Sequence, residues 1–149
     1  MFLSFPTGTG LPQRAGAGAF FFMALLSLSS GASAAPWRSH LTLPSGDEVL
    51  LRTSGRALQS AGSRAEIDLP ARVRFARPVD SPGGPVALVD AKVRILCKGG
   101  TVTAAAMKPR RADEQLLAAK DRKAAASAIQ APLLKVLSTP AVIDSLCQR

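Results

Sequence analysis

Cys97 and Cys147 are the only two thiols in this chain, and His40 is its only imidazole. A redox or catalytic thiol usually needs a C-x-x-C spacing or strongly basic surroundings, and Cys97 has only Lys98 beside it. In an exported protein, two cysteines are more often paired than free. Closing a loop of about 50 residues would stabilise the fold by about 4 kcal/mol. The two cysteines therefore predict a structural disulfide, with redox chemistry as the alternative.

His40 offers little chemistry by itself. A metal site needs several converging ligands, and a catalytic triad needs a positioned serine. The carboxylates are sparse, and an acid–base site would have to be assembled from distant residues such as Asp47, Glu48 and Glu66, around His40 or Glu66. The chain has no G-x-S-x-G, H-E-x-x-H, Walker or G-x-G-x-x-G motif. We therefore expect a solvated histidine in a loose N-terminal segment, and a protein that is not an enzyme and has no metal or other cofactor.

Basic side chains are the more informative group, because 19 Lys and Arg stand against 10 Asp and Glu, a formal net charge of +9. On two predicted strands they share the parity opposite to the apolar residues, so they would face the same side of a sheet. We predict that this row binds ligand, and it consists of Arg72, Arg74, Lys92, Arg94 and Lys98. A second cluster, Lys108, Arg110 and Arg111, is expected just after the sheet.

A positive sheet face would attract an anionic polymer or an extracellular protein. Nucleic acid is not an expected partner, because the chain is only 5% aromatic and has no Tyr. It therefore has few aromatic side chains on which bases could stack. The alternative is a solvated face without a ligand, in a chain whose composition is generally rich in arginine. The oligomeric state is open.

The elements that position these residues are strands first and helices last. Apolar and polar residues alternate over residues 67–75 and 86–98, and weaker strands are expected at residues 41–43, 48–53 and 101–107. Residues 54–64 and 78–85 resemble loops, and Gly99-Gly100 marks a tight turn. This pattern predicts an antiparallel meander with one buried face.

Two helical segments are expected after the strands. Residues 109–131 lack Gly and are rich in Ala, Lys, Arg and Leu, with Leu116, Leu117 and Ile129 as a thin apolar face. Pro132 is expected to end this helix, and residues 133–137 to form a short apolar turn. Thr139 then resembles an N-cap, with Pro140 at the first position of a final helix that ends near Cys147.

The N-terminus has the features of an export signal. Residues 15–28 form an uncharged run after Arg14, and Ala32 and Ala34 form the A-x-A pattern of a signal-peptidase site. As a helix the run spans about 21 Å, short of the ~30 Å hydrocarbon core of a membrane. We predict a signal peptide over residues 1–34, no membrane span after its removal, and a periplasmic, surface-associated or secreted product. A short membrane anchor is the alternative.

Several of these features together resemble the surface-adhesin protein E family of small exported bacterial proteins. They are Trp37 soon after the signal, a strand that carries Cys97, and a helical tail from Ser138 to Cys147. The resemblance implies a small antiparallel sheet with a C-terminal helix, held by a disulfide between Cys97 and Cys147. It also implies binding of host matrix and serum proteins, such as vitronectin and laminin.

Together these observations predict a single α+β domain over residues 35–149, with a small antiparallel sheet, one or two C-terminal helices and one disulfide. We expect an exported, non-enzymatic binding protein that is adhesin-like and uses its basic sheet face. The alternative is a structural or accessory cell-envelope protein that docks a partner through the Ala-rich helix or mobile insert of residues 110–131.

Overall fold

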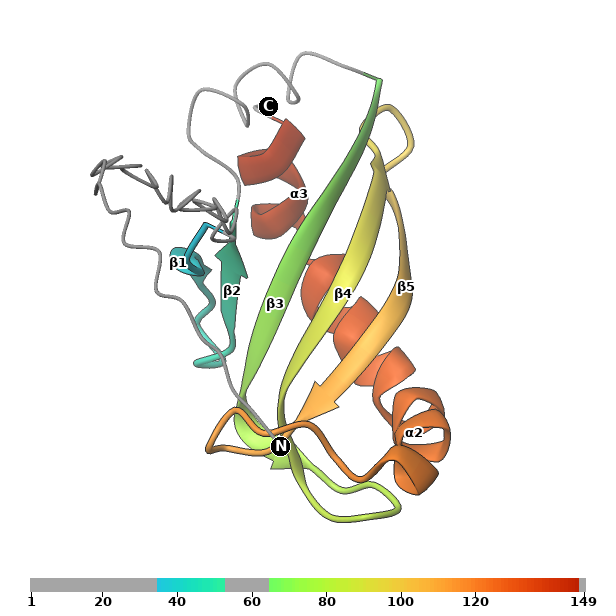
Figure 1. The fold of residues 1–149 in the computed structure, drawn as a ribbon. Helices are drawn as coiled ribbons and strands as arrows, with labels where there is room; N and C mark the ends of the chain where they lie inside the picture. The colour runs from blue at the N-terminus through green and yellow to red at the C-terminus, as the bar shows by residue number, and fades with distance from the viewer. Residues whose placement is uncertain (1–34, 53–64, 148–149) are drawn as a thin grey trace, which may run out of the picture. The chain divides into compact units, whose positions relative to one another are not determined.

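A computed structural model describes residues 35–52 and 65–147, which belong to one compact unit. The predicted signal peptide, residues 1–34, and the predicted loop at residues 54–64 lie outside the described residues. The fold class is the expected one: an antiparallel sheet followed by two helices (Figure 1).

The sheet is a five-stranded meander in which each strand pairs with the next along the chain. Every neighbouring pair is antiparallel. The strands are β1 (Arg38–Thr42), β2 (Glu48–Leu51), β3 (Glu66–Val79), β4 (Val86–Leu96) and β5 (Thr101–Arg110). Helices α2 (Ala119–Leu137) and α3 (Pro140–Cys147) lie on one side of this sheet, behind it in Figure 1.

The alternation in β3 and β4 determines which face of the sheet the helices cover. On both strands the apolar residues of one parity are buried, and they face each other in register as Ile67↔Ile95, Leu69↔Val93 and Val73↔Val89. The polar residues of the other parity lie on the side of the sheet away from α2 and α3, because successive strand side chains point to opposite faces. The predicted buried face is therefore confirmed.

The boundary between sheet and helix differs from the prediction. Strand β5 continues to Arg110, so Pro109 lies in a strand and not in the first turn of a helix. Proline is tolerated here because β5 is the edge strand of the sheet. A missing N–H on the outer side of an edge strand removes no hydrogen bond between strands. Leu116 forms an isolated bridge with Arg110, and Leu117 is fully buried before α2 begins at Ala119.

The prediction that Pro132 ends the first helix is also wrong. Pro132 lies inside α2, which continues to Leu137 and includes the predicted turn at residues 133–137. The helix buries one stripe at helical spacing on both sides of the proline: Ala125, Ile129, Leu133, Val136 and Leu137. Burial of this stripe against the sheet outweighs the local cost of the proline.

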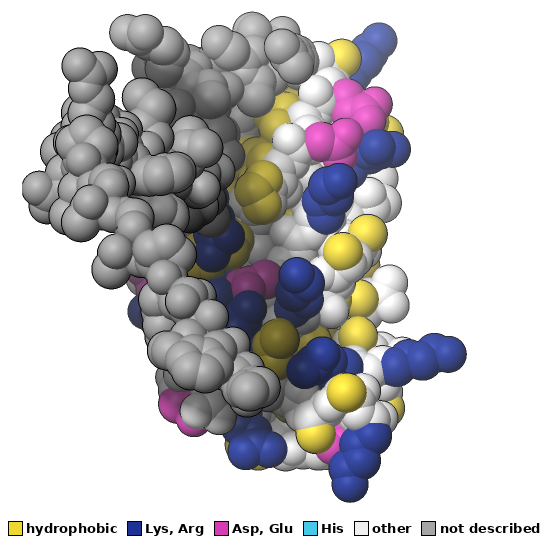
Figure 2. All heavy atoms as spheres, in the orientation of Figure 1, with side chains coloured by type: hydrophobic (Ala, Val, Ile, Leu, Met, Phe, Trp, Pro, Cys, Tyr) yellow, Lys and Arg dark blue, Asp and Glu magenta, His cyan; other side chains and the backbone are white. Residues whose placement is uncertain are grey.

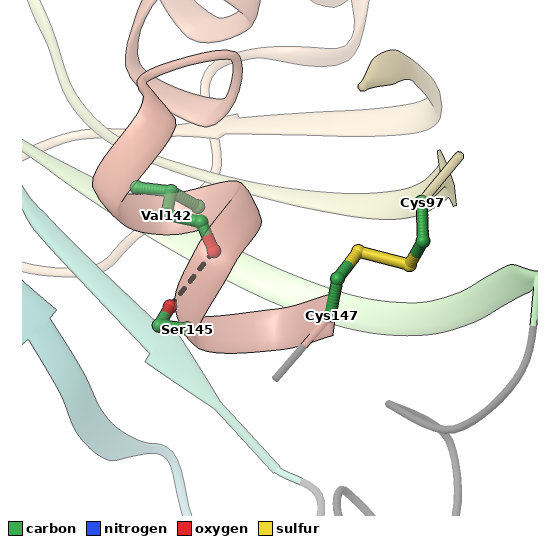
Figure 3. Close-up of a disulfide and its surroundings, with 4 residues drawn as sticks. All are labelled: Cys97, Val142, Ser145 and Cys147. Carbon is green, nitrogen blue, oxygen red and sulfur yellow. Dashed lines mark hydrogen bonds between the residues drawn. A yellow bond between two sulfur atoms is a disulfide. The ribbon is translucent and has the colours of Figure 1, made fainter. Parts of the chain in front are cut away.

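The last helix and the disulfide agree with the prediction. Helix α3 begins at Pro140 and buries Val142, Ile143, Leu146 and Cys147. The Thr139 hydroxyl, however, donates to the carbonyl of Lys135 (3.2 Å) and does not cap α3. Cys97, just after β4, and Cys147 form a disulfide with their Cα atoms 5.7 Å apart (Figure 3). It joins the end of β4 to the end of α3.

Candidate anion-binding site on the open sheet face

The side of the sheet away from α2 and α3, which we call the open face, holds most of the predicted basic row. Figure 2 shows Lys and Arg side chains spread over this face, with acidic side chains among them. Four of the five predicted residues lie on its strands: Arg72 and Arg74 on β3, and Lys92 and Arg94 on β4. Lys98 lies beyond the end of β4, next to the Gly99-Gly100 turn.

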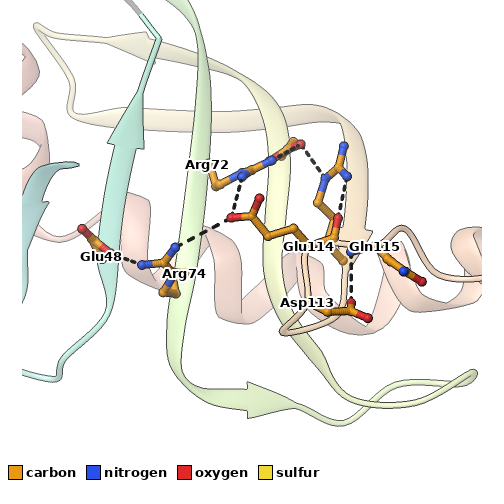
Figure 4. Close-up of polar contacts among 8 residues, drawn as sticks. Glu48, Arg72, Arg74, Asp113, Glu114 and Gln115 are labelled. Carbon is orange, nitrogen blue, oxygen red and sulfur yellow. Dashed lines mark hydrogen bonds and ion pairs between the residues drawn. The ribbon is translucent and has the colours of Figure 1, made fainter. Parts of the chain in front are cut away.

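Arg72 is buried and paired, and is not part of an exposed cationic row. Its residue is 5% exposed, and its Nε donates to Asp90 Oδ1 at 2.5 Å while Nη2 donates to Oδ2 at 3.1 Å. Arg110 Nε donates to the same Asp90 Oδ2 at 2.8 Å. Arg72 Nη1 also lies 3.4 Å from Glu114 Oε1 (Figure 4). One carboxylate thus connects β3, β4 and β5.

This arrangement changes the acidity of both partners. Burial alone would raise the pKa of Asp90, but the hydrogen bonds and charges of Arg72 and Arg110 outweigh it and hold that pKa below its usual range. The hydrogen bond to Asp90 in turn raises the pKa of Arg72. Both groups are therefore charged at neutral pH, and they compensate each other's charge in an ion pair.

The other two predicted arginines also have partners. Arg74 Nη1 donates to Glu48 Oε2 at 3.0 Å, and Arg94 Nε lies 3.0 Å from Glu66 and 3.1 Å from Asp68. These are exposed ion pairs between neighbouring strands, which solvent screens. They reduce the charge that the arginines offer to a ligand without removing it.

A shallow depression of about 360 Å³ lies on the open face beside Asp90. A β-bulge shapes it, because the β4–β5 register shifts between Asp90 and Lys92, and Ala106 on β5 has a left-handed backbone with φ of 52°. A bulge bends a strand and redirects its side chains. The wall of the depression consists of Trp37, Arg52, Pro70, Asp90, Ala91, Lys92, Ala106, Lys108 and Arg110.

Lys92, Lys108 and Arg52 give this depression its charge. Within residues 35–52 and 65–147 none of the three has an ion-pair partner, and all three are exposed. Lys108 and Arg110 belong to β5 itself, whereas they were expected after the sheet. Arg52 and Lys108 are not in the predicted ligand-binding row, because only the pairing of the strands brings them close to Lys92.

Trp37 supplies the only described aromatic surface at the depression. Arg52 Cζ lies 4.4 Å and Arg72 Cζ lies 4.8 Å from its ring centroid, within the range of cation–π contacts. Its buried Nε1 has no hydrogen-bond partner among the described residues, so stacking holds the ring. Trp37 is noticeable in the sequence as the one tryptophan of the chain. Its position at the depression, however, depends on the path of the chain just before β1.

The sequence predicts His40 in a loose segment, but it lies within β1, at the register shift between Ser39 and Leu41. Its Nε2 lies 3.0 Å from Ser145 Oγ, and that hydroxyl donates to the Val142 carbonyl at 2.8 Å. Since the serine proton is used in this way, Nε2 donates to Oγ. The pair therefore attaches β1 to α3, and burial lowers the pKa of His40.

The carboxylates that an acid–base site would need stay apart. Asp47 accepts the Ala76 N–H, while Glu48 and Glu66 lie in the ion pairs with Arg74 and Arg94. In the described part of the chain, no three His, Cys, Asp or Glu side chains come together as metal ligands would.

Comparison of the chain with protein-family models, with curated proteins and with solved structures finds no match. The resemblance to the surface-adhesin protein E family therefore stays a prediction. Among the described helices none is long and apolar enough to cross a membrane by itself, and only α2 and α3 together reach that length and composition, across a bend of 68°.

Proposed function

We propose that this protein is a non-enzymatic, exported binding module that holds an anionic ligand on its open sheet face. The observation that carries the proposal is the depression around Trp37, where Arg52, Lys92 and Lys108 converge without ion-pair partners among the described residues. Converging cations on a concave surface raise the local potential and attract an anion. An aromatic wall beside them adds apolar contact area for a ligand with flat or sugar-like faces.

The ligand class that fits best is a sulfated or carboxylated polysaccharide. The cations lie on an open, shallow surface, which suits a chain that passes over it better than a small molecule that must be enclosed. The exposed pairs of Arg74 and Arg94 extend the basic character along the strands, and their arginines can exchange a carboxylate for a ligand group. Lys98 would lie at the far end of such a track.

The alternative function, docking of a partner through residues 110–131, also stays a prediction. The outward side of α2 carries exposed small and basic residues, among them Lys120, Lys123, Ala124 and Ala128. Its other side is already packed against the sheet, so a partner would have only this polar surface to contact.

A charge-reversal experiment tests the proposed site. Lys92→Glu/Lys108→Glu changes two exposed side chains that make no hydrogen bond or ion pair with another described residue, so the fold should survive. We expect affinity for a fluorescein-labelled heparin oligosaccharide, measured by anisotropy at low salt, to fall by at least about tenfold. The dependence of affinity on salt should also become less steep, because fewer counterions are released.

The matched control is Lys120→Glu/Lys123→Glu on α2, which changes the net charge equally on the other side of the sheet. It should keep most of the affinity. Equal losses in the two variants would mean that heparin responds only to net charge, and they would refute the open face as the site. Arg72 is not a suitable target, because its loss would leave Asp90 buried without its main partner.

A further inference from the structure

A second concave surface lies on the helix side of the molecule, away from the proposed site. It is a groove of about 610 Å³ between the β1–β2 turn, the last residues of β3 and the second half of α2. Its volume is in the range of small-molecule sites, which is roughly 300–1,000 Å³. The lining includes Phe75, Arg77, Val79, Pro132, Lys135 and Val136.

The floor and walls of this groove are mainly apolar. Phe75 is 6% and Val136 also 6% exposed, and Val79 and Pro132 are half-buried. Pro132 is the residue that interrupts the hydrogen bonding of α2, and in this position its ring becomes part of the wall. Such a surface favours a ligand with an apolar body.

The charges of the groove are unbalanced. Arg77 and Lys135 are exposed, and neither has an ion-pair partner within the described ranges. The single carboxylate, Asp47, is already used, because one oxygen accepts the Ala76 N–H at 2.8 Å and the other accepts the Ser45 hydroxyl at 2.7 Å. These neutral donors leave Asp47 its negative charge, so the groove carries two exposed cations, from β3 and α2, against one carboxylate, an excess of one positive charge.

We infer that this groove binds a small amphipathic carboxylate, with its apolar body against Phe75 and Val136 and its carboxylate between Arg77 and Lys135. Charge complementarity selects an anion over a neutral or cationic ligand, and the apolar lining selects a hydrocarbon or aromatic body over a sugar. The site does not depend on the open face, since no residue lines both depressions.

Titration of the full chain with octanoate, followed by two-dimensional amide NMR, tests this assignment. We expect saturable shifts that concentrate on Phe75, Arg77, Lys135 and Val136. Octanamide, which has the same body and no charge, should bind at least about fivefold more weakly. Lys135→Glu and Arg77→Glu should each weaken octanoate binding by about tenfold, because a charge-assisted contact becomes repulsive.

The control on the same helix is Lys120→Glu, which should leave octanoate affinity unchanged. Lys92→Glu/Lys108→Glu should also leave it unchanged, which separates this site from the proposed function. Each variant's own spectrum shows whether it is folded. Shifts spread over the whole surface without saturation, equal affinity for octanamide, or equal losses in Lys120→Glu would overturn the inference.

Discussion

Asp90 is a charged residue on a sheet face that has a structural role and also lies at the edge of the proposed binding site. Arg72 is almost completely buried, and a guanidinium is tolerated there only because Asp90 satisfies two of its nitrogens. Arg110 shares that carboxylate from the next strand. With Asp90 occupied in this way, the neighbouring Lys92 and Lys108 are the cations that stay available to a ligand.

His40 leads to a prediction about pH at the same scale. Its pKa in the folded protein lies below 6.5 because burial disfavours the charged ring, whereas the unfolded chain takes up a proton near that value. As the pH falls, the unfolded chain therefore binds this proton before the folded protein does. The contribution of His40 to the free energy of unfolding is present above about pH 6.5 and is lost below it. We expect a lower free energy of unfolding in urea at pH 5.5 than at pH 7.5.

The chain has one histidine, so this decline should depend on a single side chain. His40→Gln keeps a donor for Ser145 Oγ and removes the titration. The variant should show little change between the two pH values. A decline as large as that of the original protein would place its origin elsewhere.

At the scale of elements, α2 is a helix whose packing overrides its local sequence. Ile129 and Leu133 lie on either side of Pro132, and both are buried in the core against the sheet. A proline in a helix interior removes one hydrogen bond and crowds the preceding turn. The helix continues because ending at Ala131 would leave Leu133, Val136 and Leu137 without their partners in the core.

Pro132→Ala should therefore stabilise the protein, since it restores a backbone donor to α2 at a site where the helix already exists. We expect the free energy of unfolding in urea to rise by about 1–3 kcal/mol. Pro140→Ala is the matched control, because a proline at the first position of a helix lacks only an N–H that would be unpaired there. A loss of stability in Pro132→Ala would show that packing of the proline ring stabilises the protein more than the restored hydrogen bond does.

At the scale of the whole molecule, the sheet separates two surfaces with different characters. The open face is polar, shallow and crossed by ion pairs, whereas the helix side encloses the core and carries the apolar groove at one end. The two proposed sites can therefore be occupied at the same time. The disulfide holds the helix layer to the sheet at the end of β4, because it joins two residues 50 positions apart.

Removing that disulfide should lower the stability of the entire fold. In the chain-entropy model a loop of this length contributes about 4 kcal/mol, so Cys97→Ser/Cys147→Ser should lose about that much in urea unfolding. Reduction of the original protein with dithiothreitol should shift its unfolding midpoint in the same direction. A double variant with unchanged stability would mean that α3 is held by its packing alone.

The positions of charged partners could not be predicted, because they depend on long-range register. Val79 pairs with Val86 at the β3–β4 loop, and counting back from there would place Arg72 opposite Val93. An irregularity between Arg74 and Val79 shifts the register, so Arg72 faces Asp90 instead. The extra residue of the bulge at Ala106 acts in the same way on β5 and brings Lys108 opposite Asp90.

Features that follow from local periodicity and covalent chemistry were predictable from the order of the residues. These were an antiparallel meander, the buried parity of its two long strands, the last helix from Pro140 and the pairing of Cys97 with Cys147. Tertiary structure decided that Pro109 lies in β5, that α2 continues through Pro132, and that Trp37 stands beside Lys92 and Lys108. The reason is that strand alternation repeats every two residues along the chain, whereas these outcomes depend on the energy of contacts between residues far apart in it.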